Sequence, residues 1–127
     1  MREIKFRAWD KTVKKMHEIK SLQWVIFDDK EIVTAYFKDD PKIEYMDFDT
    51  GNGMLLQFTG LKDRNGKEIY EGDICKWLDE IGQVFWSEEN WCFCVGLPDT
   101  VWSWVHGRNN SKLEIIGNIY ENPELLK

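Results

Sequence analysis

The chain has 127 residues and a formal net charge of −6, and 43% of its residues are hydrophobic, including 7 Trp and 7 Phe. This composition excludes a disordered chain, and no apolar run reaches the ~18 residues of a membrane-spanning helix. The acidic balance disfavours tight binding to a phosphate backbone. Residues 1–20 are the exception, with seven Lys or Arg against three acids, and this basic start could contact nucleic acid or an acidic partner.

The cellular setting follows from the first residues and from the cysteine count. The opening MREIKFRAWDKTVKK has no apolar stretch of the signal-peptide kind, so we expect a cytoplasmic protein with no membrane partner. The chain has three cysteines, an odd number that argues against a secreted disulfide framework.

The N-terminal part alternates apolar and polar residues with a period of two, which is typical of strands. Residues 4–9 and 16–19 predict one hairpin, and residues 22–27 and 32–37 predict a second one around Asp28-Asp29. The run SLQWVIF, residues 21–27, would also fit a short helix, so an α+β arrangement is possible here. Further strands are expected at residues 43–48 and 54–60.

The stretch TGLKDRNGKEIYEGDI, residues 59–74, predicts two tight reversals. Asn65-Gly66 is a strong hairpin signal, because a type I′ turn needs a positive φ at both central residues. Gly72 makes the second reversal, and Gly60 precedes the first. On this interpretation Gly60, Asn65, Gly66 and Gly72 are structural turn residues.

The remaining strands are short and regularly spaced. They are expected at residues 74–78, 83–86, 91–97, 101–105 and 113–120, with a helical turn at the C-terminal tail. Such spacing suggests a barrel or sandwich. We therefore predict a mainly β protein, with N-terminal hairpins or a small sheet over residues 1–58 and an SH3-like β-barrel over residues 59–127.

Three blocks of the chain resemble the YopX family of phage and prophage proteins. They are IKFRAWD followed by KKM, QFTGLKDRNGKEIYEGDI, and EIIGNIYENPELL, in the order that the family shows. Family members usually have Val where this chain has Cys75, so the resemblance does not support Cys75 as a required thiol. It implies a small protein of a phage or prophage that acts in the bacterial cytoplasm, and it transfers no catalytic residues.

Two constellations would fit metal chemistry. Cys92 and Cys94 share a strand face and could join Cys75 and His106 around zinc, but they lack the paired knuckle spacing of structural zinc sites. The Asp47/Asp49 pair would suit a metal-dependent nuclease or other hydrolase. Acidic residues beside turns are more often a solvated rim. We therefore expect no metal, no cofactor and no catalytic residues.

Two groups of residues are candidates for a contact surface. One surrounds the Asn65-Gly66 turn and comprises Asp63, Arg64, Glu71 and Asp73, although Asp73 could instead cap backbone amides. The other is the pair Trp102 and Trp104, which share a strand face and either are exposed for binding a partner or cover the barrel interior.

These features favour a non-enzymatic module that binds a host or phage protein, or a second copy of itself. The alternatives are a nucleic-acid-binding accessory protein, which the basic N-terminal hairpin would serve, and the metal-dependent hydrolase.

Overall fold

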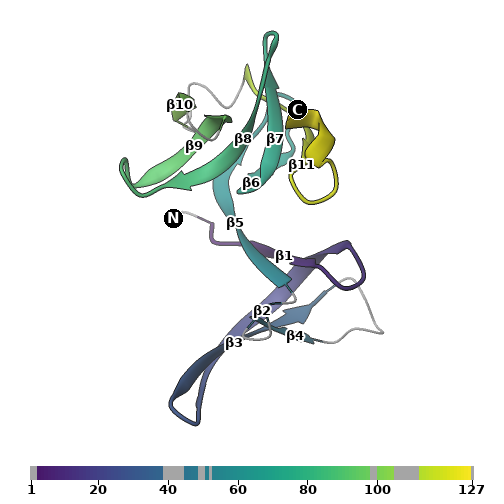
Figure 1. The fold of residues 1–127 in the computed structure, drawn as a ribbon, viewed down its shortest axis with the longest axis vertical. Coiled ribbons are helices and arrows are strands. Elements are labelled where there is room, and N and C mark those ends of the chain that lie inside the picture. Colours follow the sequence, from purple (N-terminus) through teal and green to yellow (C-terminus); the bar gives the residue numbers. More distant parts are fainter. Residues whose placement is uncertain are drawn as a thin grey trace. The chain divides into compact units, whose positions relative to one another are not determined.

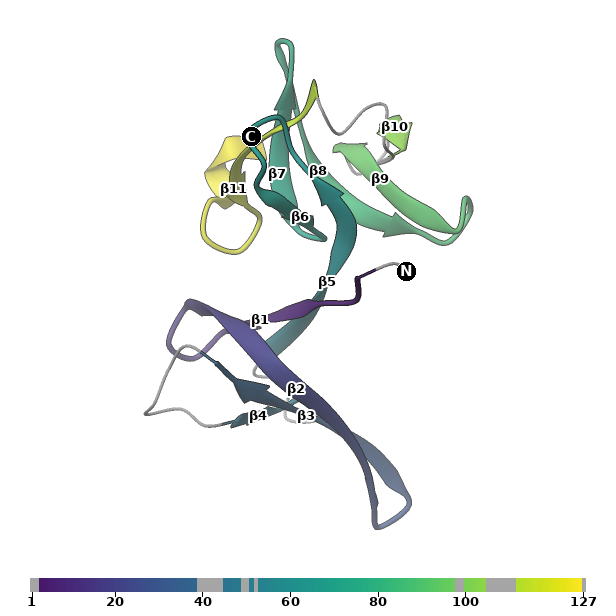
Figure 2. The same cartoon turned by 180° about the vertical axis from the view of Figure 1, so that it is seen from behind.

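The computed structural model describes residues 3–38, 45–48, 51, 53–97, 100–104 and 112–126, with backbone only for residues 45–46 and 100–104. The protein is mainly β, as predicted, and its sheets are antiparallel (Figures 1 and 2). The elements are β1 (Phe6–Asp10), β2 (Lys15–Phe27), β3 (Lys30–Phe37), β4 (Tyr45–Asp47), β5 (Gly53–Lys62), β6 (Glu68–Tyr70), β7 (Asp73–Trp77), β8 (Glu80–Ser87), β9 (Cys92–Leu97), β10 (Thr100–Trp104), β11 (Glu114–Asn118) and the 3-10 helix η3 (Pro123–Leu126).

The chain divides into two units, which are described separately. The first comprises residues 5–57 and the second residues 58–127 with the N-terminal residues 1–4. Strand β5 begins in the first unit and ends in the second. The alternation along residues 4–37 and the turn residues between the runs explain why the strands form where they were predicted.

The first unit is a meander of strands in the order β4-β3-β2-β1, with β5 on the far side of β1. Its small core is formed by Ala8, Ala35 and Phe37, with Ile19 and Leu22 packed against it. Residues 21–27 belong to one long strand, β2, so the short helix considered for them does not form.

The end of the β2–β3 hairpin extends beyond both neighbouring strands. In the described part of the chain, β1 pairs with β2 as far as Glu18, and β4 pairs with β3 from Thr34 to Tyr36. The remaining ribbon, residues 21–33, is called the β2–β3 arm below (Figure 1). It closes at Asp28-Asp29, where φ is 53° and 59°, as a type I′ turn requires.

The second unit contains a five-stranded sheet in the order β10-β9-β8-β7-β11, and β6 pairs with the end of β5. Its core brings together buried side chains from most of these segments: Ile69, Cys75, Val84, Phe93, Val95 and Leu113. Among the described residues, no ladder joins β10 to β11, so the structure shows an open five-stranded sheet. The SH3-like barrel stays a prediction.

Candidate binding surfaces

The turn that carries Asn65-Gly66 is organised by the buried carboxylate of Asp63. Its Oδ1 accepts hydrogen bonds from the amides of Asn65 and Lys67, both at 2.9 Å. Its Oδ2 accepts a third hydrogen bond, also at 2.9 Å, from the amide of Ile115 on β11. Residues 63–67 are called the Asp63 turn below. One carboxylate therefore closes this turn and ties it to a strand 52 residues further along the chain.

The electrostatics of Asp63 match this role. Burial alone raises the pKa of its carboxyl group, but the amides of Ile115, Lys67 and Asn65 and the charge of Lys67 lower that pKa below its usual value. Because the ionised carboxylate is surrounded by donors of its own chain, it is not presented to a partner. This placement favours a structural role for Asp63 over the predicted contact role.

The turn type differs from the prediction. Gly66 has a positive φ of 80°, whereas Asn65 is not among the non-glycine residues with a positive φ. The amide of Gly66 donates to the carbonyl of Asp63 at 3.0 Å. This pattern is a type I turn followed by a left-handed glycine, so the type I′ assignment is wrong. The hydrogen bond from the amide of Asn65 to the Asp63 carboxylate holds Asn65 in its conformation. The prediction considered only the pair Asn65-Gly66 and therefore did not include this contact.

The second reversal also depends on a buried carboxylate. Asp73 Oδ2 accepts a hydrogen bond from the amide of Tyr70 at 2.8 Å, which is the capping alternative considered for this residue. Gly72 has a φ of 88° and Gly60 a φ of 92°. Glu71 is half-buried. Of the four predicted contact residues near these turns, Arg64 is thus the exposed one.

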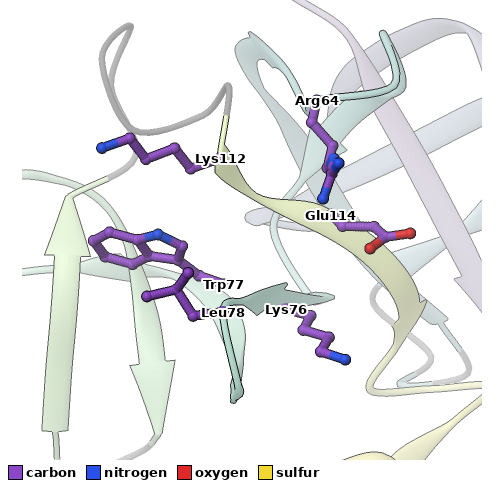
Figure 3. A pocket seen from close by; sticks show the side chains of 6 residues that line it. All are labelled: Arg64, Lys76, Trp77, Leu78, Lys112 and Glu114. Atoms are coloured by element: carbon purple, nitrogen blue, oxygen red, sulfur yellow. The ribbon is translucent and has the colours of Figure 1, made fainter.

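Beside the Asp63 turn lies an open pocket of about 580 Å³ in the second unit. β7 and the residue after it supply three of the lining residues, and the others come from the Asp63 turn, from the segment before β11 and from the first residue of β11 (Figure 3). The lining residues are Arg64, Lys76, Trp77, Leu78, Lys112 and Glu114. The pocket thus combines one indole, one apolar side chain, three cations and one carboxylate.

The backbone at the mouth of this pocket is strained. Leu78 has a φ of 57°, which is unfavourable for a bulky residue, and its side chain is 80% exposed. The strand pairing sets this geometry, because Trp77 pairs with Glu80 and leaves a two-residue loop.

Among the described residues of the first unit, the most exposed large apolar side chains lie on the β2–β3 arm. Trp24 is 58% exposed, Ile26 80% and Phe27 71%. Since successive residues of a strand point to opposite faces, Trp24 and Ile26 share one face while Val25 and Phe27 share the other. The arm therefore exposes apolar side chains on both faces.

Several predicted site residues lie outside the described part. Asp49 and His106 are not described, and neither are the side chains of Trp102 and Trp104 on β10. Asp47 is described, and its Oδ1 accepts a hydrogen bond from the Thr34 hydroxyl at 2.6 Å. That bond places Asp47 in the pairing of β3 with β4.

The cysteines behave as packed thiols. Burial, with the charges of Asp73 and Asp63, raises the pKa of Cys75 to about 12. Burial and the neighbouring Cys92 raise the pKa of Cys94 to about 11. Within the described ranges, no group of three His, Cys, Asp or Glu residues is placed to hold a metal ion.

The WCFCV segment, residues 91–95, is mostly buried. Phe93, Cys94 and Val95 are buried. Trp91 is 76% exposed, with a φ of 53°. It lies in the turn before β9, where the alternation of a strand does not yet apply.

Sequence reasoning missed the pocket and the exposure of the arm. Lys76 and Trp77 were assigned to a strand, but Lys112 and Glu114 come to the same place only through the pairing of β7 with β11. The arm left a readable signal, since the run LQWVIF is apolar on both faces. A strand with one buried face would alternate.

Comparison with known proteins adds a family and a fold. The family described as "YopX protein" matches residues 5–127. Among solved structures, protein EF1440 from Enterococcus faecalis is similar, with a TM-score of 0.67 and 29% sequence identity over 100% of both chains. Protein yopX from Bacillus subtilis has a TM-score of 0.59 and 24% identity, over 100% of this chain and 98% of that one. No curated protein matches the chain. In the part that is described, no helix has the length and apolarity needed to cross a membrane.

Proposed function

The chain belongs to the YopX family, and we propose that it is a non-enzymatic protein-binding module whose contact element is the β2–β3 arm. The partner that the structure favours is a second copy of the same chain. The setting that we propose is that of a phage or prophage protein, which modulates host or phage machinery in the bacterial cytoplasm by occupying a surface.

The observation that carries this proposal is the two-faced apolar exposure of the arm. An isolated two-stranded hairpin is marginally stable in water, and exposed apolar strands invite association. Burying one large apolar side chain contributes roughly 1.5–3 kcal/mol. Trp24, Ile26 and Phe27 therefore represent a substantial gain for a complex that covers them.

The edges of the arm favour a second copy as the partner. In the described part of the chain, residues 21–27 of β2 pair with β3 on one side only. This free edge has the sequence SLQWVIF, which contains no charge and no proline, whereas the β3 side begins with Lys30-Glu31. Charged side chains protect strand edges from pairing, and the β2 edge lacks them.

Two such edges are self-complementary when they run antiparallel about a two-fold axis. Trp24 is the central residue of 21–27, so this arrangement places the two Trp24 residues next to each other at the axis. Pairing two arms in this way extends each two-stranded ribbon to a four-stranded sheet, and it brings the apolar side chains on both faces of one β2 edge into cross-strand contact with those of the other.

Analytical ultracentrifugation over a wide concentration range tests this proposal. The wild type should form a dimer, and Trp24→Lys and Ile26→Lys should each shift it to monomer. Val13→Lys is the matched control, because Val13 is also exposed but lies in the β1–β2 turn. A wild type that is monomeric throughout would refute self-association through the arm.

The partner can also be another protein, which affinity capture from bacterial lysate would reveal. Wild-type and Trp24→Lys baits should then differ in what they retain. If they retain the same partner equally well, the arm is not the contact element.

The SH3-like barrel is also proposed here for the second unit. The order β11-β7-β8-β9-β10 supports it, since the last strand lies beside the first and the other strands follow as a meander.

A further inference from the structure

We propose that the pocket of the second unit binds a nucleotide, with the base on Trp77 and the phosphate at the cationic part of the lining. The inference does not rest on the β2–β3 arm, because every lining residue belongs to residues 58–127. A free mononucleotide and one nucleotide of a single strand present the same chemistry to this pocket.

The lining of the pocket is positively charged, whereas the whole protein is negatively charged. The whole chain has a net charge of −6, yet the pocket has three cations and one carboxylate, a local balance of +2. Arg64, Lys76 and Lys112 are exposed, and Glu114 lies opposite Lys76 in the pairing of β7 with β11. An anion that binds in such a lining gains from the positive charges near it.

The cations come from three separate segments. Arg64 lies in the Asp63 turn, Lys76 near the end of β7, and Lys112 just before β11. In Figure 3 Trp77 lies between Lys112 and Leu78, while the ends of Lys112 and Lys76 point to opposite sides of the view. The fold therefore assembles a concentration of positive charge that is spread out in the sequence.

The indole of Trp77 supplies the second half of the recognition. Trp77 is half-buried and packs against the core of the unit, so one part of the ring is anchored while another part lines the pocket. Stacking of a base on an aromatic side chain is worth ~1–3 kcal/mol. Leu78 adds an apolar wall, and Glu114 offers an acceptor for a hydroxyl or amino group.

The size of the pocket agrees with this ligand class. About 580 Å³ lies within the range of roughly 300–1,000 Å³ that is usual for small-molecule sites. Inorganic phosphate alone would leave the indole unused, and an uncharged base would leave three cations unneutralised. The combination of planar base and phosphate uses both features.

Calorimetric titration at low salt with AMP, adenosine, inorganic phosphate and an eight-residue oligo(dA) tests the proposal. AMP should bind, and adenosine and phosphate should each bind at least tenfold more weakly. The Arg64→Gln/Lys112→Gln double variant should lose roughly tenfold or more in AMP affinity, the order expected for lost charge-assisted contacts. Lys11→Gln, an exposed lysine of the β1–β2 turn, should bind as the wild type does.

A second readout places the ligand. In protein labelled with 5-fluorotryptophan, AMP should shift the ¹⁹F resonance that Trp77→Phe removes. Binding of oligo(dA) alone, lost in the double variant, would identify a single strand as the source of the nucleotide. Absence of binding by both AMP and oligo(dA), or binding that the double variant leaves unchanged, would overturn the proposal. Trp24→Lys should retain AMP binding, which separates this result from the failure of the arm.

Discussion

Replacing Asp63 by Asn removes one negative charge from the centre of the Asp63 turn while changing the side-chain volume little. In the wild type the two carboxylate oxygens accept three backbone amides. The Asn side chain has one oxygen and one NH2 group. Its NH2 group would therefore face backbone N–H groups, and two donors cannot form a hydrogen bond with each other. Either the Ile115 contact or the contacts with Asn65 and Lys67 are then lost.

The size of the effect follows from these contacts. A hydrogen bond to a charged group is worth about 1.5–3 kcal/mol, and the loss of the buried charge also removes its desolvation cost. We therefore expect Asp63→Asn to lower the free energy of unfolding by about 2 kcal/mol at neutral pH. Urea unfolding followed by tryptophan fluorescence measures this change. Asp79→Asn, an exposed carboxylate in the two-residue loop after β7, should have little effect.

The dependence on pH gives the sharper test. The pKa of Asp63 in the folded protein lies below its ordinary value of 3.8. The stability contributed by the ionised carboxylate is thus fully present above about pH 4 and is lost as the pH falls through the folded-state pKa. The difference between wild type and Asp63→Asn should stay constant from pH 7 to 5 and shrink toward pH 3. A difference that does not shrink, or that is absent at pH 7, would refute the assigned role of Asp63.

Three further changes test other parts of the second unit. Gly82→Ala should lower the free energy of unfolding, measured with urea, by about 2 kcal/mol or more, because the new Cβ would lie 2.7 Å from the carbonyl carbon of Gly96; unchanged stability would show that the strands separate easily. Leu78→Gly should raise the free energy of unfolding, measured by thermal denaturation, by less than about 1 kcal/mol, since relief of the positive φ exceeds the entropic cost of glycine. A decrease in this free energy would mean that the Leu78 side chain contributes packing. Cys75, with a pKa of about 12, should resist thiol reagents at pH 8 while half-buried Cys92 reacts, as mass spectrometry of the modified native protein would show.

The strands and their order along the chain were predictable because they depend on local patterns. The alternation of residues 4–9 and 16–19 gives β1 and the start of β2, and Asp28-Asp29 gives the turn between β2 and β3. Each of these signals needs only a few neighbouring residues. The mainly β character and the family followed from the same short stretches, and both are confirmed.

The features that escaped prediction depend on contacts between distant residues. The conformation of Asn65 is set by Asp63, and Asp63 is fixed in turn by Ile115. The pocket requires Lys112 and Glu114 to lie beside β7, which no local pattern states. The predicted contact roles of Trp102 and Trp104 concern side chains outside the described residues and stay predictions.

The charged residues of the Asp63 turn have different roles. Asp63 accepts the amide of Ile115, and the amide of Arg64 donates to the carbonyl of Leu113 at 2.9 Å, so two hydrogen bonds attach the turn to the start of β11. These bonds fix the backbone of Arg64 relative to Lys112 and Glu114, which share the pocket with it. The buried acid thus holds in place an exposed cation, and a sequence that needed only a hairpin would require neither residue. If the pocket binds a nucleotide, Asp63→Asn should weaken that binding as well as the fold, although Asp63 does not line the pocket.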